Sequence, residues 1–168
     1  MGDSARCVDF RKYYFFIALI IFALDQSTKW LVAQRIEMNN TVTVVPGFFS
    51  ISHVLNPGAA FSLFADSGSE YTPIALIVFS LLVLIGVSIA VWRFGPHFRR
   101  TGLALAFILG GALGNLLDRI RIGSVVDFLM FKLGQYHWPD FNVADSAIVV
   151  GSIFLIGEIF FHRHEAQS

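Results

Sequence analysis

Charged side chains are scarce in this sequence, and their signs cancel. Lysine and arginine number 12 and aspartate and glutamate number 12, so only 14% of the 168 residues are charged and the formal net charge is zero. The chain therefore lacks the basic excess that favours nucleic acid as a partner. Its single cysteine, Cys7, excludes an internal disulfide and a cysteine-built metal site. No G-x-S-x-G and no H-E-x-x-H motif is present, which counts against serine-hydrolase and zinc-peptidase chemistry.

Apolar side chains dominate instead. They make up 55% of the residues, and the mean hydropathy of +0.67 is too high for an ordinary soluble domain. Four apolar segments are about as long as the ~20 residues that a helix needs to cross a bilayer. These segments are residues 13–33, 71–92, 101–119 and 142–161. We expect one integral membrane domain over residues 1–168, an all-α membrane protein with four transmembrane helices.

The first apolar segment has a second interpretation. A basic flank followed by an apolar stretch is also the pattern of a secretory signal peptide. However, no cleavage site made of small residues follows the segment, which continues through Asp25 and Lys29 into Trp30. We therefore expect this segment to be retained as a transmembrane helix.

Residues 39–64 differ in composition from the four apolar segments. They are rich in β-branched residues and contain turn residues at Pro46–Gly47, which predicts two short strands lying on the membrane surface. A tight turn of small residues follows at residues 56–61 (NPGAAF). This turn is either an ordinary hairpin turn or a place where the Asn56 amide points at a bound peptide.

Cationic residues in the short flanks indicate the orientation. One set of flanks holds most of them: Arg6, Arg11, Lys12, Arg93, Arg99, Arg100 and Arg163. The positive-inside rule therefore places both termini in the cytoplasm. The β segment and the loop that contains Asp127 then face outward.

Polar residues gather at the outward end of the third segment. Asn115, Asp118 and Arg119 are spaced i, i+3, i+4 and share one helix face. The simplest interpretation is an Asp118–Arg119 ion pair at the interface, with Asn115 bonding across helices. Just before them, Gly110 and Gly114 form a GxxxG pattern, which is typical of closely packed membrane helices.

Two further aspartates lie on the same side. We expect Asp127 in a loop, and Asn142 and Asp145 at the start of the fourth helix as N-cap and N3 residues. Capping explains Asn142 but not a convergence of aspartates at a membrane border, where charges are costly. Two close carboxylates hold one proton between them, so one can activate a water while the other donates a proton. Asp127 and Asp145 are therefore candidates for an aspartic peptidase pair.

Asp25 and Lys29 are spaced i, i+4 on the first helix. They form either an ion pair that lowers the cost of inserting both charges or a support for the active site. The spacing alone leaves both possibilities open.

Five blocks of the sequence, taken together and in this order, carry a resemblance to a known family. They are residues 25–29 (DQSTK), 56–61 (NPGAAF), 111–119 (GALGNLLDR), 126–128 (VDF) and 141–145 (FNVAD). The chain resembles the lipoprotein signal peptidase (signal peptidase II) family over nearly its whole length.

The resemblance implies a bacterial inner-membrane aspartic endopeptidase that cuts prolipoproteins before the diacylglyceryl-modified cysteine. It implies four transmembrane helices with a small periplasmic β-cradle, inhibition by globomycin, and no metal or cofactor. Asp127 and Asp145 match the catalytic positions. The supporting and substrate-binding positions match Asn56, Gly58, Asn115, Asp118, Arg119, Asn142, Asp25 and Lys29. We expect a monomer in the lipid bilayer.

Two other functions compete with this one. In a metal-dependent lipid phosphatase or phosphotransferase, Asp118, Asp127 and Asp145 would hold Mg²⁺ and Arg119 the phosphate. Few other cationic residues lie near the site, which counts against this function. In a small proton-coupled transporter, Asp25 or Asp118 would carry the proton, but such a protein needs charges near mid-membrane, whereas these cluster at one border.

Overall fold

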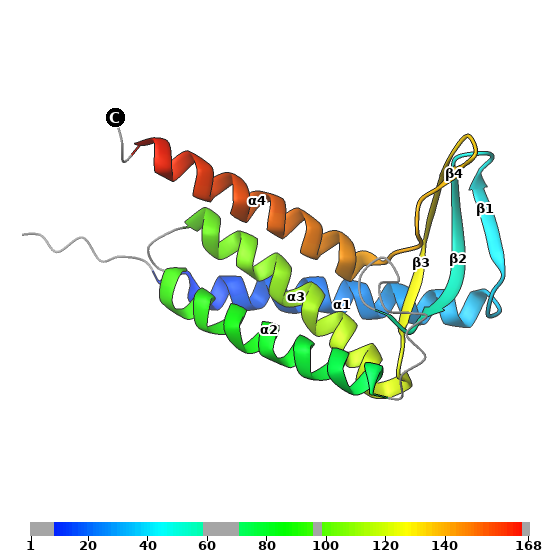
Figure 1. Cartoon of the computed structure of the whole chain (residues 1–168), viewed down its shortest axis with the longest axis horizontal. Helices are drawn as coiled ribbons and strands as arrows, with labels where there is room; N and C mark the ends of the chain where they lie inside the picture. The colour runs from blue at the N-terminus through cyan, green and yellow to red at the C-terminus, as the bar shows by residue number, and fades with distance from the viewer. Residues whose placement is uncertain (1–8, 59–70, 96–98, 166–168) are drawn as a thin grey trace, which may run out of the picture.

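The computed structural model describes residues 9–58, 71–95 and 99–165, with side chains up to residue 160. Its elements follow the order α1 (Arg11–Arg35), β1 (Thr41–Val45), β2 (Phe49–Asn56), α2 (Thr72–Phe94), α3 (Arg99–Ile122), β3 (Val125–Leu133), β4 (Tyr136–His137) and α4 (Val143–Glu165). Figure 1 shows a bundle of long helices with a small sheet across one of its ends.

Four helices among the described residues are long and apolar enough to span a membrane, as predicted. Each extends beyond its apolar segment by up to a few residues at most ends, because the polar ends of the segments are also helical. Helix α2 shows the lipid-facing character most plainly, since Val91 is its one buried residue and Phe79 and Leu82 are exposed. An exposed apolar surface of this extent fits a bilayer rather than water.

Helix α3 lies at the centre of the bundle, against α1, α2 and α4. Its glycines allow the close approach that the GxxxG pattern predicted. A Cβ on Gly110 would lie 2.6 Å from the carbonyl oxygen of Ala18 in α1. A Cβ on Gly111 would collide with the Ala144 carbonyl oxygen in α4, and one on Gly114 with the Asp25 carboxylate. The absence of side chains at these three positions of α3 thus lets α1 and α4 bring their polar side chains close to it.

The sheet is antiparallel with the order β1-β2-β3-β4. Its first two strands confirm the prediction for the β segment, with Gly47 at φ 74° in the turn between them. Residues 59–64 of the predicted β segment, which include the second half of the predicted turn, lie outside the described residues. The prediction of a loop at Asp127 was wrong, because Asp127 lies in β3 and pairs with Val54 of β2. Strand β3 forms through this long-range pairing, and its other residues, such as Val125, Val126 and Phe128, favour a strand.

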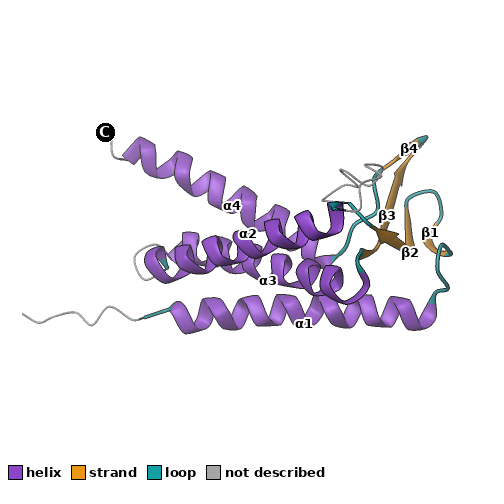
Figure 2. Ribbon diagram, turned by 60° about the horizontal axis from the view of Figure 1, so that its bottom comes forward, coloured by secondary structure: helices purple, strands orange, loops and turns teal. Residues whose placement is uncertain are grey.

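The sheet covers one end of the bundle (Figures 1 and 2). The start of α1 and the far end of α4 lie at the opposite end (Figure 1). Strand β3 directly follows α3, and α4 begins shortly after β4. The polar ends of α3 and α4 therefore meet beneath β2 and β3, where the predicted site residues gather.

Candidate active site

The ammonium group of Lys29 ties α1 to α3. Its Nζ lies 2.9 Å from Asp25 Oδ2 and 2.8 Å from Asp118 Oδ2, and it donates to Asn115 Oδ1 at 3.0 Å. All these groups are buried, with Asp25 at 0% and Lys29 at 3% exposure. Asp25 Oδ1 also accepts the backbone N–H of Ala144, at the start of α4, at 2.9 Å. The predicted Asp25–Lys29 ion pair is confirmed, and it also fixes the start of α4.

Gln26 belongs to the same cluster, although the sequence analysis gave it no role. Its Nε2 donates to Asp118 Oδ1 at 3.0 Å, to Asp25 Oδ2 at 3.2 Å and to the Gly114 carbonyl at 3.3 Å. Its position in the sequence block 25–29, directly after the buried Asp25, could have indicated a role for Gln26. A side-chain amide at this position can donate hydrogen bonds to carboxylate oxygens that Lys29 alone does not satisfy.

Asn115 connects the Lys29 ion cluster to Asp145. Its Oδ1 accepts from Lys29, and its Nδ2 donates to Asp145 Oδ1 at 2.7 Å. Since the Lys29 ammonium can only donate, the Asn115 side-chain oxygen must face it and the NH₂ must face Asp145. The orientation of the amide, and with it the position of the Asp145 carboxylate, is set by the buried cation.

Asn142 links the two candidate catalytic aspartates. Its Nδ2 donates to Asp127 Oδ1 at 2.7 Å, and its Oδ1 accepts the backbone N–H of Asp145 at 2.8 Å. The second bond is the helix cap that the sequence predicted. Nδ2 also lies within 3.3 Å of Asn115 Oδ1, so the two amides touch. The structure thus brings Asp127 and Asp145 to one place, held through one fully buried asparagine.

Asp127 is 2% exposed and bonded on both oxygens. Its Oδ2 accepts from Asn56 Nδ2 at 2.9 Å. Removal from water, and then the negative charge of Asp145, raise the pKa of Asp127 from 3.8 to about 7. The amides of Asn56 and Asn142 and the more distant charge of Lys29 oppose the rise. Near neutral pH this side chain therefore carries a proton for much of the time.

Arg119 does not pair with Asp118. Its Nη2 donates to the Gly58 carbonyl at 3.2 Å, and its Nη1 to the Asn115 carbonyl at 3.4 Å. Gly58 N in turn donates to Asn56 Oδ1 at 2.9 Å. The predicted ion pair between Asp118 and Arg119 was wrong, because Asp118 forms its ion pair with the buried Lys29. Arg119 instead holds the turn that presents Asn56 to Asp127.

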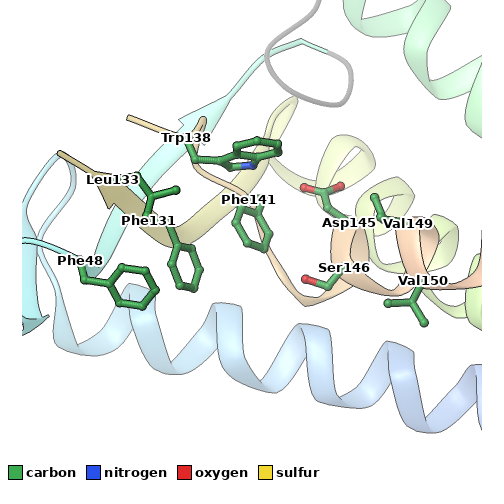
Figure 3. A pocket seen from close by; sticks show the side chains of 9 residues that line it. All are labelled: Phe48, Phe131, Leu133, Trp138, Phe141, Asp145, Ser146, Val149 and Val150. Atoms are coloured by element: carbon green, nitrogen blue, oxygen red, sulfur yellow. The ribbon is translucent and has the colours of Figure 1, made fainter. Parts of the chain in front are cut away.

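An open apolar groove of about 500 Å³ leads to Asp145. Figure 3 shows Phe48, Phe131 and Leu133 of the sheet region at one end and Val149 and Val150 of α4 at the other. Asp145 and Ser146 lie in its wall between these groups, near Phe141 and Trp138 (Figure 3). These aromatic residues were not predicted from the sequence to belong to a site. Such a surface suits an apolar segment that reaches the carboxylate from the bilayer side.

The described residues contain no cluster of three or more His, Cys, Asp or Glu that could hold a metal ion. Asp118, which the metal-dependent alternative needs as a ligand, is bonded to Lys29, to Gln26 and to the Val126 backbone N–H at 3.3 Å. A carboxylate neutralised in this way is poorly placed to bind Mg²⁺. Asp118 is therefore a poor candidate for the third ligand that the metal-dependent function needs.

Comparison with solved structures defines the class of protein first. The chain superposes with a TM-score of 0.78 on a structure described as a bacterial membrane enzyme, solved by the in meso method at 2.3 Å, with 27% identity over 89% of this chain and 88% of that one. A second bacterial membrane enzyme, solved at 1.9 Å, also gives 0.78 and 27%, over 88% and 92%. The fold is thus that of a membrane enzyme.

Sequence relatives define the family. The lipoprotein signal peptidase of Desulforapulum autotrophicum is 44% identical over 88% of this chain and 91% of its own. That of Solibacter usitatus is 42% identical over 95% and 98%, and that of Listeria monocytogenes 38% over 88% and 93%. The family model described as Signal peptidase (SPase) II matches residues 17–161. The chain belongs to the signal peptidase II family, as the five sequence blocks predicted.

Proposed function

We propose that this protein is an aspartic endopeptidase that removes signal peptides from prolipoproteins, cleaving before the diacylglyceryl-modified cysteine. Asp127 and Asp145 are its catalytic pair. The observation that carries this proposal is the position of Asn142, which donates to Asp127 Oδ1 and accepts the Asp145 N–H. Family membership supports the reaction, and this geometry supports the choice of residues.

The chemistry follows from the shared proton. Because the pKa of Asp127 is raised to about 7, the pair keeps one proton at neutral pH. The ionised carboxylate takes a proton from a water held between the two groups, and the protonated one gives its proton to the scissile carbonyl oxygen. As the resulting gem-diol collapses and the C–N bond breaks, the second carboxylate takes back a proton from a gem-diol hydroxyl. The leaving amine takes the proton that the first carboxylate removed from water, so the pair returns to its starting protonation state. Cleavage therefore falls as the pH rises above about 7 and the shared proton is lost.

The remaining site residues position this pair. Asn56, Asn115 and Asn142 fix the carboxylates by direct bonds. Behind them, Asp25, Lys29 and Asp118 form the buried anchor for Asn115, while Arg119 and Gly58 hold the turn of Asn56. The Asp127 carboxylate is thus held on both oxygens, and Asp145 is held at its carboxylate by Asn115 and at its backbone N–H by Asn142. Such preorganisation is what catalysis needs.

We place the sheet and the site on the periplasmic side of the inner membrane, with both termini in the cytoplasm. Arginines at the opposite end of the bundle support this orientation. The Arg11 guanidinium lies 4.4 Å from the ring centre of Trp92, and that of Arg99 lies 3.9 Å from the ring centre of Phe10. Such cation–aromatic pairs suit a membrane–water interface. We also propose that the whole chain forms one domain and acts as a monomer.

The test is incubation of the purified protein in detergent with a diacylglyceryl-modified precursor, followed by mass analysis. We expect two products, a free signal peptide and a protein that begins with the modified cysteine. EDTA should leave the reaction unchanged, whereas globomycin should stop it. An intact precursor would refute the proposal, and cleavage that EDTA abolishes would favour metal-dependent chemistry.

A further inference from the structure

A second groove, of about 410 Å³, begins at the other catalytic candidate, Asp127. Met130, His137 and Asp140 line it together with Asp127, whereas Phe131 and Leu133 line the apolar groove. The catalytic pair therefore separates two grooves of different character. The apolar one reaches Asp145 along α4, and the more polar one leaves Asp127 towards the far end of the sheet.

Asp140 gives the second groove an unsatisfied acceptor. Its Oδ2 accepts a hydrogen bond of 2.6 Å from Ser52 Oγ on β2, which holds the carboxylate in place. Its Oδ1 is buried and has no hydrogen-bond partner among the described residues. The imidazole Nε2 of His137 lies 3.4 Å from this oxygen but does not form a hydrogen bond with it. A buried carboxylate oxygen without a donor is costly, and a donor from a bound molecule would relieve that cost.

The charge of the groove has one sign. Among the described residues that line it, Asp127 and Asp140 are acidic, and none is lysine or arginine. The side chain of Asp140 is only 11% exposed, so solvent screens its charge poorly. A ligand that carries an ammonium, guanidinium or N–H group is favoured here, and a carboxylate is disfavoured.

We propose that this groove binds the mature side of the precursor, the residues just after the lipidated cysteine, and that Asp140 makes it prefer cationic over acidic residues there. The assignment rests on the proposed peptidase function. The apolar groove extends along α4 into the bilayer, so it suits the apolar signal peptide. The polar groove on the sheet is left for the part of the substrate that lies outside the membrane.

The sheet register sets which substrate residues reach Asp140. Its neighbour Phe141 pairs with Leu129, two residues along β3 from Asp127. Its partner Ser52 lies four residues along β2 from Asn56, which bonds Asp127. At ~3.3 Å per strand residue, Asp140 is about 7–13 Å from the catalytic pair. An extended substrate covers that distance with its second to fourth mature residues.

The experiment compares diacylglyceryl-modified precursors that differ only at mature positions two to four, with lysine, glutamine or glutamate at all three. For the wild-type protein we expect kcat/KM to be about three- to tenfold higher for the lysine precursor than for the glutamate one, the size of effect expected from a partly buried ion pair. Most of the difference should appear in KM, because these contacts lie away from the reacting bond. Asp140→Asn keeps the shape of the side chain and should bring the ratio close to one.

His137→Lys provides a second variant, since the His137 side chain is about half exposed and tolerates replacement. Its ammonium group should satisfy Asp140 from within the chain and also remove the preference. Asp9→Asn is the matched control, because it removes an exposed carboxylate at the other end of α1 and should keep the wild-type ratio. Equal cleavage of all three precursors by the wild type, or an unchanged ratio in both groove variants, would overturn this assignment and leave the peptidase function standing. Cleavage of none of them would overturn both.

Discussion

Replacing Lys29 by methionine tests whether the buried ion cluster holds the site together. The substitution keeps most of the volume of the side chain but leaves Asp25 and Asp118 buried without their cation. It also removes the donor to Asn115 Oδ1. Breaking a buried pair from one side costs about 3–5 kcal/mol, because an uncompensated charge stays behind. Here two carboxylates lose the same partner, so we expect the upper part of this range.

The assay is thermal unfolding in detergent, followed by tryptophan fluorescence. For a chain of this size ~1 kcal/mol shifts the Tm by about 2–4 °C, so Lys29→Met should lower the Tm by roughly 10–20 °C. The triple variant Asp25→Asn, Lys29→Met, Asp118→Asn removes the stranded charges and should recover much of the loss. Lys12→Met, at an exposed position, is the control and should stay within about 2 °C. A loss below about 1 kcal/mol for Lys29→Met would refute the reasoning.

Three further predictions concern packing, catalysis and pH. Gly114→Ala should destabilise the protein by about 1–3 kcal/mol in thermal unfolding, because the new Cβ meets the Asp25 carboxylate, whereas Gly86→Ala meets nothing and should not. Asn142→Ser should keep the helix cap yet slow precursor cleavage about a hundredfold, since it loses the bond to Asp127. Asp127→Asn should stabilise the protein only at a pH above the pKa of 3.8 that the Asp127 carboxyl has in the unfolded chain. The raised pKa of Asp127, about 7, means that wild-type stability falls between about pH 4 and pH 7. The gain in unfolding free energy should grow from near zero at about pH 4 to roughly 4 kcal/mol at about pH 8, and a gain that is equal at both pH values would contradict this cause.

The helices and the polar blocks could be predicted because their signals are local. Long apolar segments need no partner to be identified, and the glycine pattern of α3 already indicated close packing. The cap formed by Asn142 on Asp145 is local as well. For the same reason the i, i+4 pair of Asp25 and Lys29 was found.

Features that depend on long-range pairing could not be predicted. Asp127 was predicted in a loop, but the structure pairs it with Val54 of β2, and its partner Asn56 comes from a distant part of the chain. Asp118 was paired with its neighbour Arg119, but the fold brings Lys29 within 2.8 Å of it. The contact between Ser52 and Asp140 likewise exists only once β2 and β3 are paired.

The central claim is that Asp127 and Asp145 act as one proton-sharing pair. The most direct test is the rate of precursor cleavage by Asp127→Asn and by Asp145→Asn, each checked for wild-type folding by thermal unfolding and compared with Asp9→Asn. We predict that each dyad variant loses about a thousandfold or more of the activity while Asp9→Asn loses none. Turnover at the wild-type rate by either dyad variant would contradict the account.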